Sequence, residues 1–141
     1  MEEQQISDIA DRLRGSRSVL FITGAGISAD SGLPTYRGIG GLYEQDETDD
    51  GVPIEAALSG AMFARDPALT WKYIHQIESS CRDAGPNRAH RAIAELERRF
   101  DRVWTLTQNV DGLHHAAGSL QVIDIHGDVH RLLCTRCGHR W

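Results

Sequence analysis

Near its N-terminus the chain reads Ser18-Val19-Leu20-Phe21-Ile22-Thr23-Gly24-Ala25-Gly26-Ile27-Ser28. The apolar run at 18–22 is continuous and does not alternate, which is typical of a strand in a parallel sheet that is covered on both faces. The run passes directly into a glycine turn and a predicted helix. Such a turn lets backbone N–H groups approach a phosphate closely, and the start of the helix adds partial positive charge. A simple tight turn has the same pattern, so this segment predicts a fold before it predicts a ligand.

Two further buried strands are predicted, at 103–107 and 122–125. Helical patterns stand before and between the strands, beginning with an amphipathic helix whose apolar residues are Ile6, Ile9, Ala10 and Leu13. This alternation predicts an α/β fold, a Rossmann-like parallel sheet with helices on both faces. Three strands are fewer than a doubly wound nucleotide fold needs, so we expect the sheet to be incomplete.

We expect residues 1–131 to form the N-terminal part of this domain, with a helical insertion at about 54–100. Asp66-Pro67 predicts the start of one helix in this insertion, because an N-cap acceptor precedes a proline at the first helical position. Asn87 precedes another predicted helix. Residues 32–53 are rich in glycine and acidic residues and predict a long loop, which inside a domain is usually functional or mobile.

Polar residues follow the second and third predicted strands: Gln108-Asn109-Val110-Asp111 and His126-Gly127. In open parallel sheets, ligands bind beyond the carboxyl ends of the strands. Asn109 and Asp111 would point the same way in an extended segment, where a carboxamide and a carboxylate could pair with an amide-bearing ligand such as nicotinamide. A loop of Asx turns would use the same residues.

His126 is a candidate general base, because an imidazole has an unperturbed pKa near 6.5 and titrates close to neutral pH. Three other histidines lie nearby in the sequence: His114, His115 and His130. Spacing alone does not choose among the four.

Composition and motif details argue against several classes of protein. The formal net charge of −5 argues against a broad electrostatic grip on nucleic acid. No apolar run approaches the roughly 20 residues that cross a bilayer, so no membrane partner is expected. The polar start Met1-Glu2-Glu3 is unlike a secretory signal, and a cytoplasmic location is expected. An ordinary dehydrogenase is disfavoured, because no acidic ribose ligand can be assigned about 20 residues beyond the glycine turn.

The three cysteines indicate a metal site more than a disulfide framework. Cys134 and Cys137 have the spacing of zinc ligands, but a structural zinc site normally needs four. His139 is a conceivable third ligand, and a thioredoxin-like redox pair is the alternative. Residues 132–141 are therefore predicted to be the first half of a zinc-binding module. Cys81 stands alone in a helical stretch and is expected to be an inert thiol.

Together these motifs resemble the sirtuin family. The run at 24–38 looks like the long cofactor-loop signature of the family, and Thr107-Gln108-Asn109-Val110-Asp111-Gly112-Leu113-His114 is similar to its second signature. His126-Gly127 falls where the catalytic His-Gly lies, and Cys134 and Cys137 fall where the first zinc pair lies. The resemblance spans residues 18 to 138 in order and in rough spacing.

The resemblance implies an NAD-dependent protein-lysine deacetylase, which transfers the acyl group of an acyl-lysine protein or peptide to ADP-ribose and releases nicotinamide. It implies His126 as general base on a ribose hydroxyl, Asn109 and Asp111 at the nicotinamide, and Gln108 in the ribose pocket. NAD and zinc are the implied cofactors, with Cys134 and Cys137 as zinc ligands. The implied cofactor-binding residues are Gly24, Ala25, Gly26, Ile27, Ser28, Pro34, Tyr36, Arg37, Gln108, Asn109 and Asp111.

Two departures concern the substrate and the cofactor loop. Tyr36 stands where phenylalanine is common in the family, a mild change. Family members that favour acidic acyl groups carry a Tyr-x-x-Arg motif, and the corresponding positions here are Ile74 and Ile77. Two aliphatic side chains cannot pair with a succinyl carboxylate, so we expect a preference for acetyl or other uncharged acyl groups.

The largest departure is that the second CxxC and the C-terminal strands of the family do not follow. We expect this chain to be a truncated form that is inactive alone, and its incomplete sheet to invite self-association. Two alternatives keep the resemblance but change the activity. One is a sirtuin-like mono-ADP-ribosyltransferase, and the other is a non-catalytic fragment that binds NAD or a partner.

Overall fold

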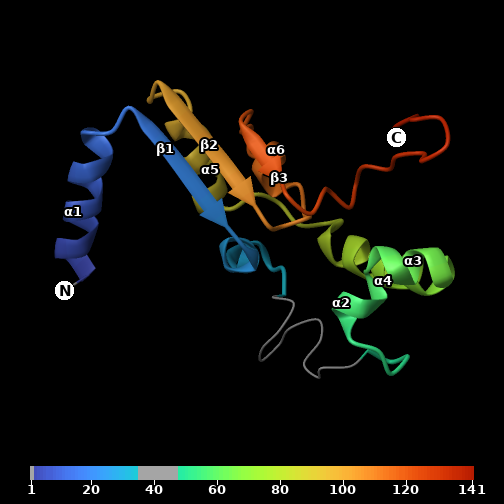
Figure 1. Cartoon of the computed structure of the whole chain (residues 1–141). Helices are drawn as coiled ribbons and strands as arrows, with labels where there is room; N and C mark the ends of the chain where they lie inside the picture. The colour runs from blue at the N-terminus through green and yellow to red at the C-terminus, as the bar shows by residue number, and fades with distance from the viewer. Residues whose placement is uncertain (1, 35–47) are drawn as a thin grey trace.

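The computed structural model describes residues 2–34 and 48–141. Its centre is a parallel three-stranded sheet in the order β1 (Ser18–Thr23), β2 (Arg102–Thr107) and β3 (Val122–Asp124) (Figure 1). Thr23 pairs with Thr107, and Thr107 pairs with Asp124, so the carboxyl ends of all three strands meet at one edge. The predicted Rossmann-like parallel sheet, incomplete in strand number, is confirmed.

One face of the sheet is covered by α5 (Arg88–Leu96) and α6 (Leu113–Ala116). The two helices meet through the rings of His90 and His114, whose centroids lie 4.9 Å apart. His114 also binds the sheet, because its Nε2 lies 2.9 Å from Thr23 Oγ1 at the end of β1. Thr105 and Thr107 of β2 are buried on this same side. We call this side the covered face.

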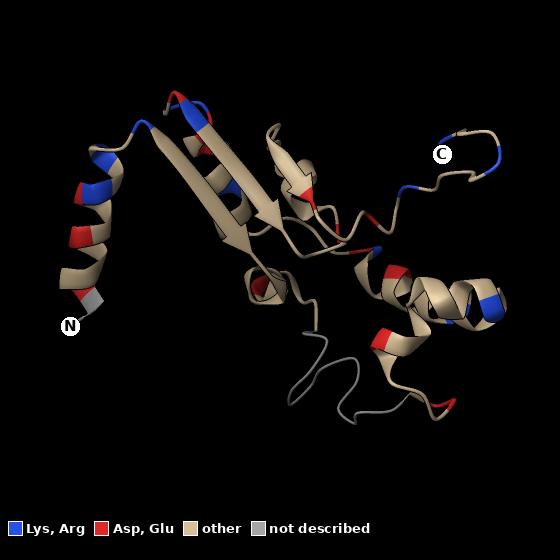
Figure 2. Cartoon of the chain, in the orientation of Figure 1, with Lys and Arg blue, Asp and Glu red and all other residues tan. Residues whose placement is uncertain are grey.

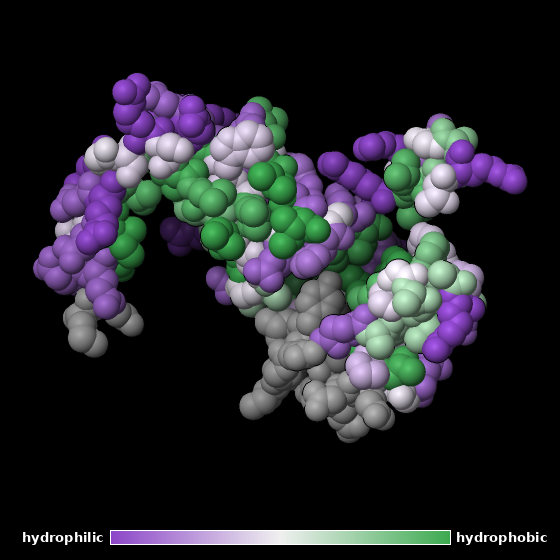
Figure 3. Space-filling model, viewed as in Figure 1, coloured by the Kyte–Doolittle hydropathy of each residue, from purple (hydrophilic) through white to green (hydrophobic). Residues whose placement is uncertain are grey.

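The other side, called the open face, is formed by Leu20, Ile22, Trp104 and Ile123, which are exposed. Strand register places them together, since Leu20 pairs with Trp104, and Leu106 pairs with both Ile22 and Ile123. Hydrophobic side chains gather over the strands in Figure 3. In the described ranges, helices therefore cover one of the two faces and not both as predicted, because the strands and helices that would cover the second face are not among these residues. Self-association through the incomplete sheet stays a prediction, and the open face is the apolar surface available for it.

The N-terminal helix α1 (Glu2–Arg14) stands beside the sheet in Figure 1. Its apolar residues Ile6 and Ile9 are exposed, as expected for a stripe that meets no other layer. The turn after β1 continues as a short 3₁₀ helix, η1 (Ala25–Ser31), which ends at Gly32 with a φ of 80°. Glycine fits this left-handed position without strain.

A separate helical unit consists of α2 (Ile54–Ala57), α3 (Gly60–Arg65) and α4 (Pro67–Cys81). It packs around a small core of Ile54, Ala57 and Tyr73. The predicted helix start at Asp66-Pro67 is confirmed, because Asp66 Oδ1 accepts a hydrogen bond of 3.1 Å from Leu69 N. A second cluster, made of Leu33, Ile77, Cys81 and Leu113, joins α4 to the turn after η1 and to α6.

The helix after Asn87 lies inside the predicted insertion but packs with α6 over the sheet. The proposed division of the chain into residues 1–131 and 132–141 stays a prediction. Residues 132–141 form a small antiparallel loop, with an isolated bridge between Leu133 and Arg140.

Charged residues of both signs are interspersed over the helices and turns in Figure 2, while the middle of each strand carries no charge. No helix within 2–34 or 48–141 is long and apolar enough to cross a bilayer.

Candidate active site

A cleft of about 860 Å³ lies at the carboxyl ends of the three strands. Its volume is within the usual range for small-molecule sites, about 300–1,000 Å³. Each strand contributes the residues that follow it, so segments far apart in the sequence meet here. These residues are Gly24 and Ala25 after β1, Gln108, Asn109 and Val110 after β2, and His126 and Gly127 after β3.

A smaller cavity of about 30 Å³ shares Ala25, Ile77, Asn109 and Val110 with the cleft. Ser28, Pro34 and Asp111 also line it. Of the predicted cofactor-binding residues that the structure describes, those that do not line the cleft therefore line the cavity next to it, apart from Gly26 and Ile27. Ile27 instead closes the glycine turn, because its N–H donates to Gly24 O at 3.1 Å.

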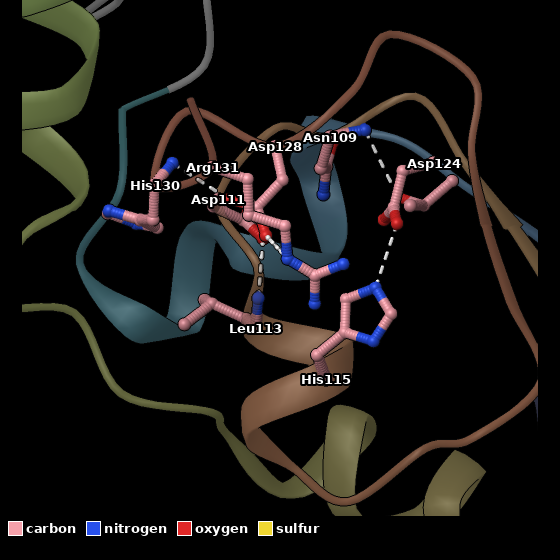
Figure 4. Close-up of polar contacts among 9 residues, drawn as sticks. Asn109, Asp111, Leu113, His115, Asp124, Asp128, His130 and Arg131 are labelled. Carbon is pink, nitrogen blue, oxygen red and sulfur yellow. Dashed lines mark hydrogen bonds and ion pairs between the residues drawn. The ribbon is translucent and has the colours of Figure 1, made fainter. Parts of the chain in front are cut away.

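A buried hydrogen-bond network joins the glycine turn to the loop after β2. Ser28 Oγ donates to Asp111 Oδ2 at 2.6 Å, and Asn109 Nδ2 lies 3.1 Å from both Ser28 Oγ and Gly24 O. Ser28, Asn109 and Asp111 are all less than 10% exposed. Asn109 and Asp111 therefore point toward the same turn, which agrees with the two-residue spacing. Asp111 Oδ1 also accepts from Leu113 N at 2.9 Å, so the alternative Asx turn is present as well (Figure 4).

Backbone bonds beyond the strands hold these loops in register. Gln108 N donates to Thr23 O at 3.0 Å, and Ile125 N donates to Thr107 O at 3.1 Å. Gly127 takes a φ of 81°, and its N–H donates to Asp124 O. A residue with a side chain would be strained at this φ, which explains why a glycine follows His126.

The structure separates the four candidate histidines. His114 is buried, and burial lowers its pKa to about 4, with the neighbouring His90 adding to the effect. His115 Nε2 lies 2.8 Å from Asp124 Oδ2, and Figure 4 shows its ring directed at that carboxylate. His130 Nδ1 lies 4.0 Å from Glu78 Oε1. His126 is the one of the four that lines the cleft.

The rest of the cleft is lined by an apolar wall and a few charged residues. Most of these residues were not predicted from the sequence to have a role. The wall is formed by Leu58, Trp71, Ile74, Ile77, Val129, Leu132 and Leu133. Among the charged residues, Arg131 Nε lies 3.2 Å from Asp128 Oδ2. Asp128 also packs against Gly112, where an added Cβ would meet Asp128 Oδ2 at 3.4 Å. Gly112 has a φ of 69°, and the presence of a glycine directly after Asp111 was the signal in the sequence for this close approach.

Asn87 makes a contact with the glycine turn after β1 that was not predicted from the sequence. Its Nδ2 donates to Ile27 O at 2.7 Å, across 60 residues of sequence. The sequence indicates that a helix follows Asn87, but it gives no signal for this long-range bond. Tyr36 and Arg37, predicted to lie on the cofactor loop, are outside the described residues.

Cys134 and Cys137 lie on a tight turn that is closed by two backbone bonds of 2.8 Å, Cys134 N to His139 O and Gly138 N to Cys134 O. The backbone N–H groups of Cys137 and Arg136 lower the pKa of the Cys134 thiol. This favours the thiolate, the form that binds metals. His139 packs against Trp141, and the described residues contain no metal-binding group of three or more side chains.

Cys81 is buried, which raises the pKa of its thiol to about 11, with further contributions from Asp111, Glu78 and Asp128. The thiol is therefore protonated at neutral pH. Its protonation agrees with the expectation that Cys81 is inert.

Comparison with known proteins places this arrangement in a family. Residues 24–141 match the model of the Sir2 family. The chain is 53% identical over 135 residues to the "NAD-dependent protein deacylase 2" of Pseudomonas aeruginosa, covering 94% of this chain and 52% of that protein. It is 57% identical over 130 residues to the protein of the same name from Pseudomonas syringae pv. tomato, covering 91% and 52%.

Among solved structures, a Sir2 homolog–NAD complex superposes with a TM-score of 0.79 at 37% identity, over 96% of this chain and 50% of that one. The chain spans about half the length of the curated relatives that it matches. The family model, the identities and the superposition agree, and the chain belongs to the Sir2 family.

Proposed function

We propose that the protein is an NAD-dependent protein-lysine deacetylase. Residues 1–141 would carry the glycine turn that binds NAD, the nicotinamide-binding residues Asn109 and Asp111, and the general base His126. The observation that supports this most is the cleft, which gathers the glycine turn, Asn109 and His126 from three strand ends. The Sir2 relatives named as NAD-dependent deacylases support the same activity.

The residues of the site suit a dinucleotide that carries a carboxamide. Gly24 has open space where a Cβ would project, so a ligand can approach its backbone closely. Both N–H groups of Asn109 are used by Gly24 O and Ser28 Oγ, so Asn109 Oδ1 and the Asp111 carboxylate are the groups offered next to the small cavity, where they could accept from the NH2 of a nicotinamide amide. Ser28 holds Asp111 by a hydrogen bond of 2.6 Å and thereby fixes the direction of its carboxylate.

His126 is proposed to remove a proton from a ribose hydroxyl. NAD would supply the ADP-ribose that accepts the acyl group and the nicotinamide that leaves. The contribution of the protein is a positioned base, an oriented amide and an apolar wall that excludes water. Tyr36 and Arg37 are proposed to lie over the cofactor, as the family resemblance implies.

The apolar wall supports a preference for uncharged acyl groups. Ile74 and Ile77 both line the cleft, where acid-selective relatives would present Tyr and Arg. The guanidinium of Arg131 also borders the cleft, but it is paired with Asp128. We therefore expect acetyl-lysine to be a better substrate than succinyl-lysine.

Cys134 and Cys137 are proposed to supply two of the four ligands of a structural zinc ion. Their turn and the lowered pKa of Cys134 suit thiolate coordination. Zinc content measured by atomic absorption should fall in Cys134→Ser and stay unchanged in Cys81→Ser. Equal zinc in both variants would contradict the assignment.

The test of the activity measures nicotinamide release from NAD in the presence of an acetyl-lysine peptide. The chain is assayed alone and after extension with the remaining part of the Pseudomonas aeruginosa relative. We expect release by the extended form and none by the chain alone. His126→Ala should lower the rate by about 10²-fold or more, the usual contribution of a general base, whereas His130→Ala should not.

Three outcomes would contradict parts of the proposal. Release that survives His126→Ala would remove His126 from its role. Succinyl-lysine turned over as fast as acetyl-lysine would overturn the acyl preference. ADP-ribose left on protein, in place of O-acetyl-ADP-ribose in solution, would identify a mono-ADP-ribosyltransferase. The cytoplasmic location stays a prediction.

A further inference from the structure

Asn87 makes two kinds of contact with the two ends of its side-chain amide. Its Oδ1 accepts from Ala89 N at 2.9 Å and from His90 N at 3.3 Å, so it caps the first turn of α5. Its Nδ2 points away from the helix and donates to Ile27 O at 2.7 Å. One residue therefore ties the start of α5 to the glycine turn after β1.

The turn is held from two sides. On the side of the cleft, Asn109 binds Gly24 O and Ser28 Oγ. On the other side, Asn87 binds Ile27 O, between those two positions. Asn87 lines neither the cleft nor the small cavity, so it acts on the turn and not on a ligand.

The helix behind Asn87 is a firm base for such a tie. His90, Ile93 and Ala94 of α5 are buried, and the ring of His90 packs on His114 of α6. The turn itself contains two glycines, which allow many backbone conformations when nothing fixes them. A backbone that must present N–H groups to a ligand binds more tightly when its conformation is fixed beforehand.

We propose that Asn87 is a positioning residue that fixes the Gly24–Ser28 turn through the Ile27 carbonyl and thereby raises the affinity for NAD. This inference rests on the proposed function for its ligand. It does not make Asn87 a catalytic residue, because the contacts of its side chain are with the turn at Ile27 O and with α5 at Ala89 N, His90 N and His90 Nδ1, the last at 3.0 Å.

Substitutions at position 87 can separate the tie from the cap. Aspartate and serine are as good N-caps as asparagine, but neither has an amide that could donate to Ile27 O. Asn87→Asp and Asn87→Ser should therefore keep the cap and lose the tie, whereas Asn87→Ala loses both. Serine is neutral, so it also shows whether an effect of aspartate comes only from its charge near a diphosphate.

The experiment combines two measurements. Hydrogen exchange of the chain without NAD reports whether the turn is fixed, and calorimetric titration with NAD of the extended form described under the proposed function reports the affinity. In Asn87→Asp and Asn87→Ser we expect faster exchange at residues 24–32 and unchanged exchange at residues 88–96. The Kd for NAD should rise roughly three- to tenfold, the effect of losing one hydrogen bond, while Tm stays near the wild-type value.

Asp66→Ala is the matched control, because Asp66 caps α4 and makes no contact with the turn. It should lower Tm without changing exchange at 24–32 or the Kd for NAD. Unchanged exchange at 24–32 in both Asn87→Asp and Asn87→Ser would overturn the inference. The inference would also be overturned if exchange at 24–32 and the Kd for NAD changed only in Asn87→Ala and this variant had a lower Tm. An extended form that binds no NAD would refute the proposed cofactor and the gain in affinity, and hydrogen exchange would still decide whether Asn87 fixes the turn.

Discussion

The covered face of the sheet buries polar side chains as well as apolar ones, whereas the open face exposes large apolar side chains. Thr105, Thr107, His90 and His114 are buried at the covered face, while the exposed open face consists of large apolar side chains. Protein interiors usually have the reverse distribution. The polar groups of the covered face include direct supports of the site, since Thr107 Oγ1 accepts from Asn109 N at 3.1 Å. The open face makes no such contact with the site and is suited to packing against another apolar layer.

The largest expected difference between the two faces comes from placing the same charged residue on each of them. Val103 is 3% exposed on the covered face, and Ile22 is 68% exposed on the open face, in the neighbouring strand. Val103→Asp should lower the free energy of unfolding by about 4 kcal/mol, because an unpaired carboxylate would be buried. Ile22→Asp should change it by less than about 1 kcal/mol.

Urea denaturation of the two variants measures this difference. Similar losses in both would mean that the open face is covered in solution. Sedimentation of the wild-type chain and of Ile22→Asp then shows whether a second copy covers it, because the charge should shift an assembled chain toward the monomer.

The second prediction concerns the pH dependence of stability that the buried histidines of the covered face cause. Burial lowers the pKa of His114 from its ordinary value of 6.5 to about 4, and burial lowers the pKa of His90 in the same direction. Below pH 6.5 the unfolded chain binds a proton that the folded chain does not. The free energy of unfolding should therefore fall as pH drops from about 6.5 to 4, by about 3 kcal/mol for His114.

Chemical denaturation at several pH values in this window measures the slope. His114→Gln keeps an amide that can bond Thr23 Oγ1 and removes the titrating group, so its profile should be flatter. An equally steep profile in His114→Gln would mean that other groups cause the acid sensitivity.

The smallest effect distinguishes two threonines on the covered face. Within the described part of the chain, Thr105 Oγ1 is buried without a hydrogen-bond partner, whereas Thr107 Oγ1 accepts from Asn109 N. Thr107→Val should lower the free energy of unfolding by about 1 kcal/mol. Thr105→Val should leave it unchanged or raise it by up to about 1 kcal/mol, because an unpaired hydroxyl is removed. Thermal unfolding of both variants tests this, and equal losses would contradict the assignment of partners.

The sequence predicted the three strands well, because each is a short apolar run that ends in polar residues. It could not predict which side of β2 is buried. In Val103-Trp104-Thr105-Leu106-Thr107 an alternating pattern would turn the threonines outward, but the structure buries them. Their surroundings come from helices distant in the sequence: Thr23 and His114, for example, are 91 residues apart.

The candidate site was predictable where motifs follow strand ends, and less so where a choice depended on burial. Asn109, Asp111 and the glycine turn come together because parallel strands bring their ends to one edge. Spacing alone did not choose His126 over His114; the family resemblance implied His126, and the burial of His114 under the sheet is a separate ground for the same choice. The second role of Asn87 could not be predicted either, because a cap and a long-range donor look identical in sequence.

The backbone bonds that extend the ladder past β2 and β3 have a consequence for motion. Gln108 and Ile125 are tied to the neighbouring strands, so the loops on the sheet side of the cleft cannot slide relative to one another without breaking the sheet. The unit of α2–α4 forms the opposite wall of the cleft, and it meets the sheet side through the apolar cluster of Leu33, Ile77, Cys81 and Leu113 and through the contact of Glu78 with His130. The side chains of that cluster meet through apolar contacts, which constrain the direction of a movement less than hydrogen bonds do. We therefore expect a change in the width of the cleft to come from a shift of α2–α4 relative to the sheet.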